Sequence, residues 1–137
     1  MSEANETPVR RTLTRSAILA KTEMPRRFIA TPEWADGDKT AGVWVRGMTG
    51  RERDEYETRK GEMIRTAKDA GAEYDRGTWR AELVQLCAVT ESGVGMFNAT
   101  DVAGLAQLSA APLDRLYDAI AELSGIGTRA DEAARKN

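Results

Sequence analysis

The stretch Ala41–Glu57, AGVWVRGMTGRERDEYE, joins a segment with the periodicity of a strand to a segment crowded with charge. Val43 and Val45 alternate with Trp44, as expected for a strand that has one covered face. The alternation predicts a strand over residues 40–46, and one side of this strand must point away from the rest of the protein.

The residues ahead of this strand predict its partner. Residues 27–30 have the character of a short strand, and residues 34–39 contain the turn pair Asp36-Gly37. Glycine accepts a positive φ without steric cost, which favours a tight reversal at such a pair. We therefore predict a β-hairpin, preceded by a short helix over residues 14–21.

The residues after the seam predict a capped helix. Thr49 and Glu52 have the capping-box spacing, in which the threonine oxygen accepts from an N-terminal amide and the glutamate reaches back. We predict that this helix begins at Gly50 and ends near Asp69. Its apolar stripe is thin, so most of its surface is expected to face water.

The rest of the chain is helical in pattern. Further helices are expected over residues 79–89 with Thr78 as the N-cap, around residues 102–108, from Ser109 to a stop at Gly125, and over residues 128–136. The predicted organisation is a flexible polar arm (1–12), a single domain (13–126) and a solvated C-terminal helix or tail (127–137). The fold class is α+β and mostly helical, with an N-terminal β-hairpin followed by a small bundle of four to five helices.

The composition argues against several classes of partner and of catalytic site. The chain has 137 residues and a formal net charge of −2, so no overall field draws it to nucleic acid or an anionic membrane. It has no histidine, which is the commonest general base and transition-metal ligand, and one cysteine, so no intrachain disulfide can form. No apolar run approaches the ~20 residues of a membrane span, and no signal peptide is apparent. We expect a cytoplasmic protein.

Three patterns could indicate a chemical site, but each is better interpreted as a structural feature. Asp36, Asp38 and Thr40 mimic the start of a calcium loop, but the glycine and closing glutamate that such a loop needs are missing, which favours a turn. Cys87 falls on an apolar helix face and is expected to be a buried, inert thiol. Glu52 and Glu55 belong to a charged run that is expected to be a solvated face.

That charged run also predicts two ion pairs at helical spacing, Arg51–Glu55 and Arg53–Glu57. The sequence thus gives no catalytic, cofactor-binding or metal-binding residue. Tryptophan often contributes strongly to protein interfaces, and an open hairpin face is a frequent binding surface. The residues predicted to bind a partner are Trp34, Trp44, Arg46, Tyr56, Arg10 and Arg11.

The order of segments over residues 12–126 resembles the tail assembly chaperones of long-tailed, siphovirus-type bacteriophages. The resemblance lies in TPEWADGDKTAGVWVRGMTGRERDEYE (31–57), followed by a charged linker and RAELVQLCAVTESGVGMFNATDVAGLAQLSAAPLDRLYDAIAELSGI (80–126). The resemblance is carried by the order of these segments along the chain. Met1 to Arg11 has no counterpart in the family pattern.

The resemblance implies a non-catalytic role without cofactors. Such chaperones act in the host cell cytoplasm, are absent from the mature virion, hold the tape measure protein soluble and help recruit tail tube (major tail) subunits. Many are made in two lengths by ribosomal frameshifting, so a longer form of the chain and a homo-oligomer are further implied partners. Neither a membrane nor a nucleic acid is expected as a partner.

Two other functions remain open from the sequence. The basic stretch Arg10–Arg27 suits a small nucleic-acid-binding or regulatory phage protein, although the net charge and the lack of a recognition helix speak against it. A small enzyme using paired carboxylates, as in glycoside hydrolysis, is a formal alternative.

Overall fold

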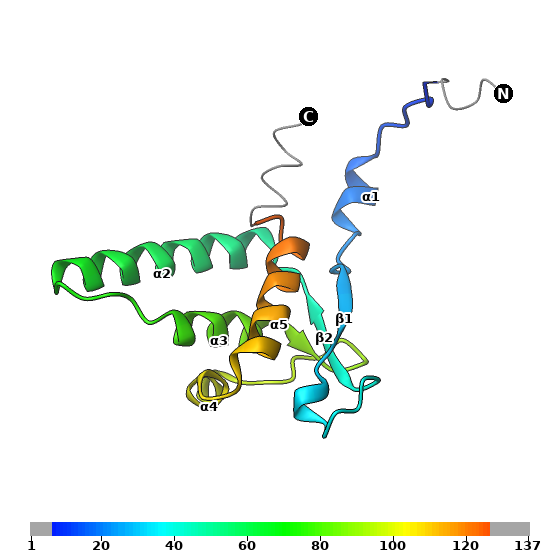
Figure 1. Cartoon of the computed structure of the whole chain (residues 1–137). Coiled ribbons are helices and arrows are strands. Elements are labelled where there is room, and N and C mark those ends of the chain that lie inside the picture. Colours follow the sequence, from blue (N-terminus) through cyan, green and yellow to red (C-terminus); the bar gives the residue numbers. More distant parts are fainter. Residues whose placement is uncertain (1–6, 127–137) are drawn as a thin grey trace.

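The computed structural model describes residues 7–126, in which an antiparallel sheet is followed by helices (Figure 1). The elements are α1 (Arg15–Leu19), β1 (Arg26–Ala30), a 3-10 turn (Pro32–Trp34), β2 (Gly42–Arg46), α2 (Gly50–Asp69), α3 (Arg76–Cys87), β3 (Ala88–Val89), a second 3-10 turn (Ala99–Asp101), α4 (Val102–Ala106) and α5 (Ala110–Leu123). This order confirms the predicted α+β, mostly helical class with its N-terminal hairpin. The predicted arm residues 1–6 and the predicted helix or tail at 127–137 lie outside the described residues.

The hairpin forms as predicted. β1 and β2 are antiparallel, with Phe28 opposite Trp44 and Ile29 opposite Val43. The chain reverses through Asp36 and Gly37, which have φ values of 52° and 87°. The positive φ at both positions explains why the turn pair is found here.

A third strand was not predicted. The helix expected to reach Val89 ends at Cys87, and β3 pairs antiparallel with β2 so that Trp44 lies opposite Val89. Ala88 adopts an extended conformation, with φ −73° and ψ 129°. The open edge of β2 offers backbone hydrogen bonds that end the helix here, and the sheet order becomes β1-β2-β3.

The starts of α2 and α3 are fixed by side-chain caps. The capping box at Thr49 and Glu52 is present, and α2 runs over the predicted residues. The start of α3 differs from the prediction, because its N-cap is Asp75, whose carboxylate accepts from the Thr78 amide at 3.1 Å. The Thr78 hydroxyl donates to the same carboxylate at 2.6 Å, so Thr78 supports the cap and does not form it.

One hydrophobic core lies between the sheet and the helices. α5 packs across β1 and β2 and against α3, while α4 covers another side of α3. Val45, Leu83, Leu116 and Ile120 have no exposed surface, and Trp79 stacks on Tyr56 with ring centroids 4.0 Å apart. The core side of the sheet is therefore the one that carries Val43 and Val45.

Two segments extend away from this core. α1 stands apart from the body and has no buried residue (Figure 1). The second half of α2 projects on the other side of the molecule, and Tyr56 is the buried residue of the whole helix. No helix in the part of the chain that the structure describes is long and apolar enough to cross a membrane.

Candidate functional site

The six residues predicted to bind a partner lie in four different places. Trp44 and Arg46 belong to β2, where their side chains alternate with the buried Val43 and Val45. Trp34 ends the 3-10 turn beyond β1, Tyr56 is in the core, and Arg10 and Arg11 precede α1.

Trp44 lies on the outer face of the sheet, as its alternation with the two valines predicted. Its ring meets that of Phe28 edge-on, with centroids 5.4 Å apart and an interplanar angle of 68°. The Arg26 guanidinium lies over the indole, 5.0 Å from its centroid, within the range of a cation–π contact. We call Arg26, Phe28 and Trp44 the aromatic platform.

The aromatic platform is open to a partner. Phe28 is 42% exposed, although an aromatic side chain in a strand is usually covered. A hollow of about 510 Å³ adjoins the platform and is lined by Arg26, Arg46, Met24 and Val89, among others. Arg26 also donates to the backbone oxygen of Glu91 at 2.9 Å, which fixes its guanidinium over the indole.

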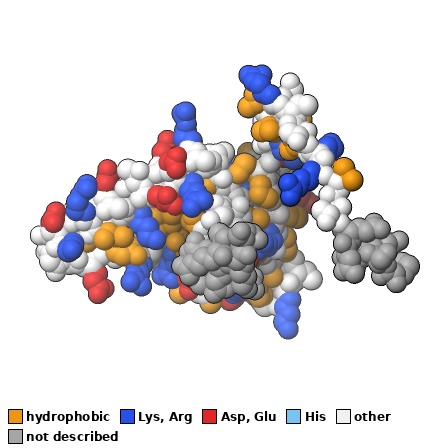
Figure 2. Space-filling model, turned by 90° about the horizontal axis from the view of Figure 1, so that it is seen from above, with side chains coloured by type: hydrophobic (Ala, Val, Ile, Leu, Met, Phe, Trp, Pro, Cys, Tyr) orange, Lys and Arg blue, Asp and Glu red, His pale blue; other side chains and the backbone are white. Residues whose placement is uncertain are grey.

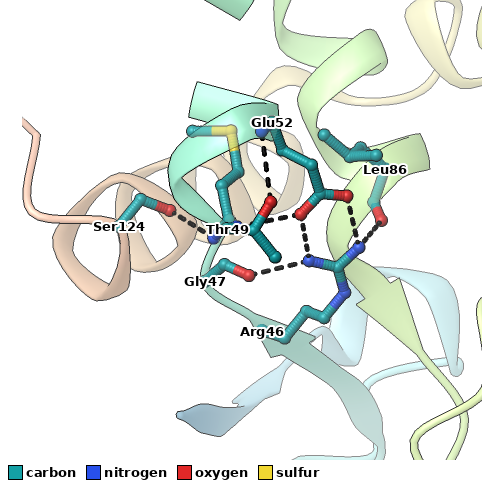
Figure 3. A network of polar contacts seen from close by, with 7 residues as sticks. Arg46, Gly47, Thr49, Glu52, Leu86 and Ser124 are labelled. Atoms are coloured by element: carbon teal, nitrogen blue, oxygen red, sulfur yellow. Dashed lines mark hydrogen bonds and ion pairs between the residues drawn. The ribbon is translucent and has the colours of Figure 1, made fainter. Parts of the chain in front are cut away.

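Arg46 holds the joint between the sheet and α2 (Figure 3). Its two terminal nitrogens donate to the two carboxylate oxygens of Glu52, at 2.9 and 3.0 Å. They also donate to the backbone oxygens of Gly47 at 2.8 Å and Leu86 at 3.3 Å. Because its donors are already engaged, Arg46 positions the outer face and is a poor candidate for a direct partner contact.

Glu52 serves this joint and the helix cap together. Its carboxylate accepts from Arg46 and also from the backbone amide of Thr49 at 2.9 Å. The hydrogen bond from Arg46 is the main cause that lowers the pKa of Glu52, and the Thr49 amide adds to it against the opposing effect of burial. Met48 completes the joint by donating from its amide to the Ser124 hydroxyl at 2.9 Å.

Trp34 is less accessible than the prediction requires. It is half-buried against the core, and its indole Nε1 is buried with no hydrogen-bond partner among the described residues. The neighbouring turn is tied to α5, because Arg115 donates to the backbone oxygen of Ala30 at 2.6 Å and pairs with Glu33. The structure therefore places Trp34 at the rim of the core.

The structure contradicts a surface role for Tyr56. Its side chain is 2% exposed, stacks on Trp79 and shares a hydrogen bond of 3.0 Å with the Tyr117 hydroxyl. Burial and the Tyr117 contact raise the pKa of Tyr56 above its ordinary value. The thin apolar stripe of α2 buries its largest member, so Tyr56 is a core residue.

Arg10 and Arg11 lie in the extended chain ahead of α1 and are exposed. No ion pair joins either of them to another residue within 7–126. Val9, Leu13, Ile18 and Leu19 are exposed in the same segment. This basic and apolar segment is therefore free to meet another molecule.

The structure gives structural roles to Cys87 and Asp38, two of the side chains considered above for chemistry. Cys87 is fully buried, and burial raises the pKa of its thiol to about 12. Asp38 accepts from the amide and hydroxyl of Thr40, at 2.9 and 2.6 Å, as a turn residue does. Within residues 7–126, no group of three or more acidic, cysteine or histidine side chains could hold a metal ion.

One of the two ion pairs predicted for α2 is present. Arg53 donates to Glu57 at 3.1 Å, whereas the described residues contain no pair between Arg51 and Glu55. Both side chains of the observed pair are exposed by 41% or more, so its contribution to stability is small. The charged run is mostly solvated, and Glu52 is the carboxylate in it that connects α2 to the sheet.

The aromatic platform was only partly predicted from the sequence. Phe28 and Arg26 were missed, although hairpin pairing places Phe28 directly opposite Trp44 and would have identified it. Comparison of the chain with known protein families, with curated proteins and with solved structures finds no match.

Proposed function

We propose that this chain is a non-catalytic tail assembly chaperone of a long-tailed bacteriophage, which binds the tape measure protein and helps recruit tail tube subunits. It would act in the host cell cytoplasm and be absent from the mature virion. The order of family-like segments over residues 12–126 supports this proposal. So does the presence of an exposed apolar surface in a small, highly charged protein.

The observation that carries the proposal is the aromatic platform. A protein that keeps a long helical client soluble needs an apolar surface that is exposed before the client arrives. The exposed Phe28 and the half-buried Trp44 provide one, and they are held by backbone pairing between their strands, so little conformational entropy is lost on binding. Arg26 beside them favours a client segment that also carries acidic side chains.

The joint supports the same role by keeping the platform rigid. Arg46 connects β2 to Glu52 at the start of α2 and to the last turn of α3 through Leu86 (Figure 3). A surface fixed in this way needs no rearrangement to accept a client. The hollow beside Arg26 and Arg46 offers space for one client side chain next to the aromatic rings.

Co-expression with the tape measure protein of the same phage tests the proposal. We expect the wild-type chain to give a soluble complex, and the variant Phe28→Ser to reduce the soluble client strongly. Phe28 is 42% exposed and lies outside the core, so this variant should keep the far-UV circular dichroism of the wild type and most of its resistance to urea. Leu108→Ser is the matched control, because Leu108 is 43% exposed and lies away from the sheet.

The proposal fails if the tape measure protein stays insoluble with the wild-type chain and the tail tube subunit does not bind either. Phe28→Ser acting no differently from Leu108→Ser would reject the platform as the client surface. Salt-dependent binding of DNA or RNA in a gel shift would instead favour the nucleic-acid-binding alternative, in which the exposed arginines ahead of α1 contact phosphates.

A further inference from the structure

A second surface lies on the opposite side of the molecule from the arm. The second half of α2 and the chain that leads into α3 border an open hollow of about 580 Å³. Its apolar lining comes from Met63, Ala67, Ala70 and Tyr74. We call it the α2 groove. Figure 2 shows hydrophobic side chains between charged ones along the projection that α2 forms.

The rim of the α2 groove is acidic. Four carboxylate side chains line it, against one guanidinium, that of Arg59; the carboxylates belong to Glu62, Glu73, Asp75 and Glu82. Asp75 is engaged as the N-cap of α3, whereas Glu62 and Glu73 are exposed and not paired in the part of the chain that the structure describes. An apolar hollow with such a rim suits a ligand that is both apolar and cationic.

Glu82 gives an independent indication of a cationic ligand. Its Oε2 atom is buried, and no hydrogen-bond donor among the described residues reaches it. Removing a carboxylate oxygen from water without a partner is unfavourable, and a positively charged donor would offset that cost. Glu82 lines the α2 groove, so a cation bound there would be placed to pair with it.

The chain itself carries a segment with the complementary properties. Leu13, Ile18 and Leu19 are 52%, 55% and 62% exposed. Residues 7–21 contain four basic side chains: Arg10, Arg11, Arg15 and Lys21. This range contains no acidic residue. An isolated helix as short as α1 is unstable in water, so α1 needs a surface to cover its apolar side chains.

We propose that residues 7–21 of one copy of this chain bind in the α2 groove of a second copy. The apolar side chains of α1 fill the hollow over Met63 and Tyr74, and a basic side chain of the arm pairs with Glu82. The contact buries the exposed leucines and isoleucine and gives the unpartnered carboxylate its donor. This inference stands on the arm and the groove, and it does not depend on the proposed chaperone function.

Chain geometry favours a second copy over the same copy. The arm joins the body at Pro25, whose backbone oxygen accepts from Gly47 at 3.1 Å, close to the start of α2. The groove begins near Met63, about 20 Å further along α2 at 1.5 Å per residue. The six residues from Leu19 to Pro25 span about 20 Å only when fully extended, so the arm would have to reverse and straighten completely to reach its own groove. The direction of α1, which points away from α2 in Figure 1, therefore favours a second copy.

The proposed contact between arm and groove determines which assemblies the chain can form. The arm and the groove are different surfaces, so each copy offers one of each. Two copies can exchange arms and close as a dimer, or successive copies can join arm to groove in a ring or a longer array. The opposite charges make either form weaker at high salt.

Two variants separate the halves of the contact. Leu19→Asp changes the arm at an exposed position, and Ala70→Arg places a bulky cation in the groove at an exposed alanine at the end of α2. Leu108→Asp and Ala103→Arg are the matched controls, because both positions are exposed and outside the arm and the groove. Glu82→Gln tests the carboxylate while keeping the size of the side chain.

The measurement is the molar mass of the full chain by sedimentation equilibrium at low and high salt. We expect the wild type and both controls to associate, more strongly at low salt, and Leu19→Asp and Ala70→Arg each to remain monomeric. Glu82→Gln should raise the Kd of association by about tenfold. An equimolar mixture of Leu19→Asp and Ala70→Arg should form a heterodimer, because one copy supplies the groove and the other the arm.

A monomeric wild type at about 100 μM would overturn the proposal, since even weak specific contacts are populated there. A wild type that associates while the mixed variants stay monomeric would show that the arm does not bind in the groove. Protection of the α2 amides that Leu19→Asp removes in a monomeric wild type would show that the arm binds its own groove, which also contradicts the second copy.

Discussion

The joint between β2 and α2 gives a stability prediction that can be worked from its contacts. Glu52→Gln keeps the shape of the side chain and removes its charge. The carboxylate accepts two hydrogen bonds from Arg46 and one from the Thr49 amide, whereas a glutamine amide has one accepting oxygen. The variant therefore leaves part of the Arg46 guanidinium without its acceptor.

The expected loss is about 2 kcal/mol in the free energy of unfolding at pH 7. A hydrogen bond to a charged group contributes about 1.5–3 kcal/mol, and the lower half of that range applies because the two side chains keep 22% and 24% of their surface exposed. The matched control is Glu57→Gln, which breaks the exposed pair with Arg53 and should cost about 0.3–0.5 kcal/mol. Equilibrium urea unfolding followed by circular dichroism measures both variants.

The difference between the wild type and Glu52→Gln should depend on pH. The pKa of Glu52 is lowered in the folded protein from its ordinary value of 4.5, so its charge stabilises the fold above that value. This contribution is lost as the pH falls through the lower, folded-state pKa, and the two proteins should then become similar in stability. A loss at pH 7 no larger than that of Glu57→Gln, or a loss that stays constant down to about pH 3, would refute the reasoning.

Three further predictions concern packing and reactivity. Gly47→Ala should lower the free energy of unfolding by about 1–3 kcal/mol, because the new Cβ would lie 2.8 Å from a backbone oxygen at the end of α5. Gly50→Ala is the control: its new Cβ would lie in open space, so urea unfolding should detect no loss of stability. Tyr56→Phe should cost about 1 kcal/mol, or about 4 °C in Tm by calorimetry, because it leaves the Tyr117 hydroxyl without its partner; an unchanged Tm would contradict that contact. The Cys87 thiol should not react with a disulfide reagent at pH 8 until the protein unfolds, because it is buried and its pKa is raised to about 12. Rapid labelling of the native protein would contradict the burial of Cys87 at the end of α3.

The sequence predicts best the elements whose signals are local. The bounds of α2 are predicted because Thr49 and Glu52 cap it within four residues of chain, and the hairpin because alternation and a turn pair coincide. β3 escapes prediction because two residues have no period, and Ala88 and Val89 continue the apolar pattern of α3. What ends that helix is the edge of β2, more than forty residues earlier in the chain.

The candidate site shows the same division. The outward face of Trp44 follows from strand alternation, which is local, and the structure places it there. The pairing of Arg46 with Glu52 does not follow, because spacing rules for ion pairs apply within one helix and these residues belong to different elements. The surface role predicted for Tyr56 is wrong because no local feature of the sequence indicates that Trp79 and Tyr117 contact it.

The direct passage from α3 into β3 has a consequence for engineering the chain. No residue separates Cys87 from Ala88, so the position of α3 determines which side chains of β3 face the core. A single inserted residue there would turn β3 over, moving Ala88 from the core side of the sheet to the other side. The exposed reversal at Gly37–Lys39 has no such constraint, so a peptide tag should be accepted at the hairpin tip and rejected at the end of α3.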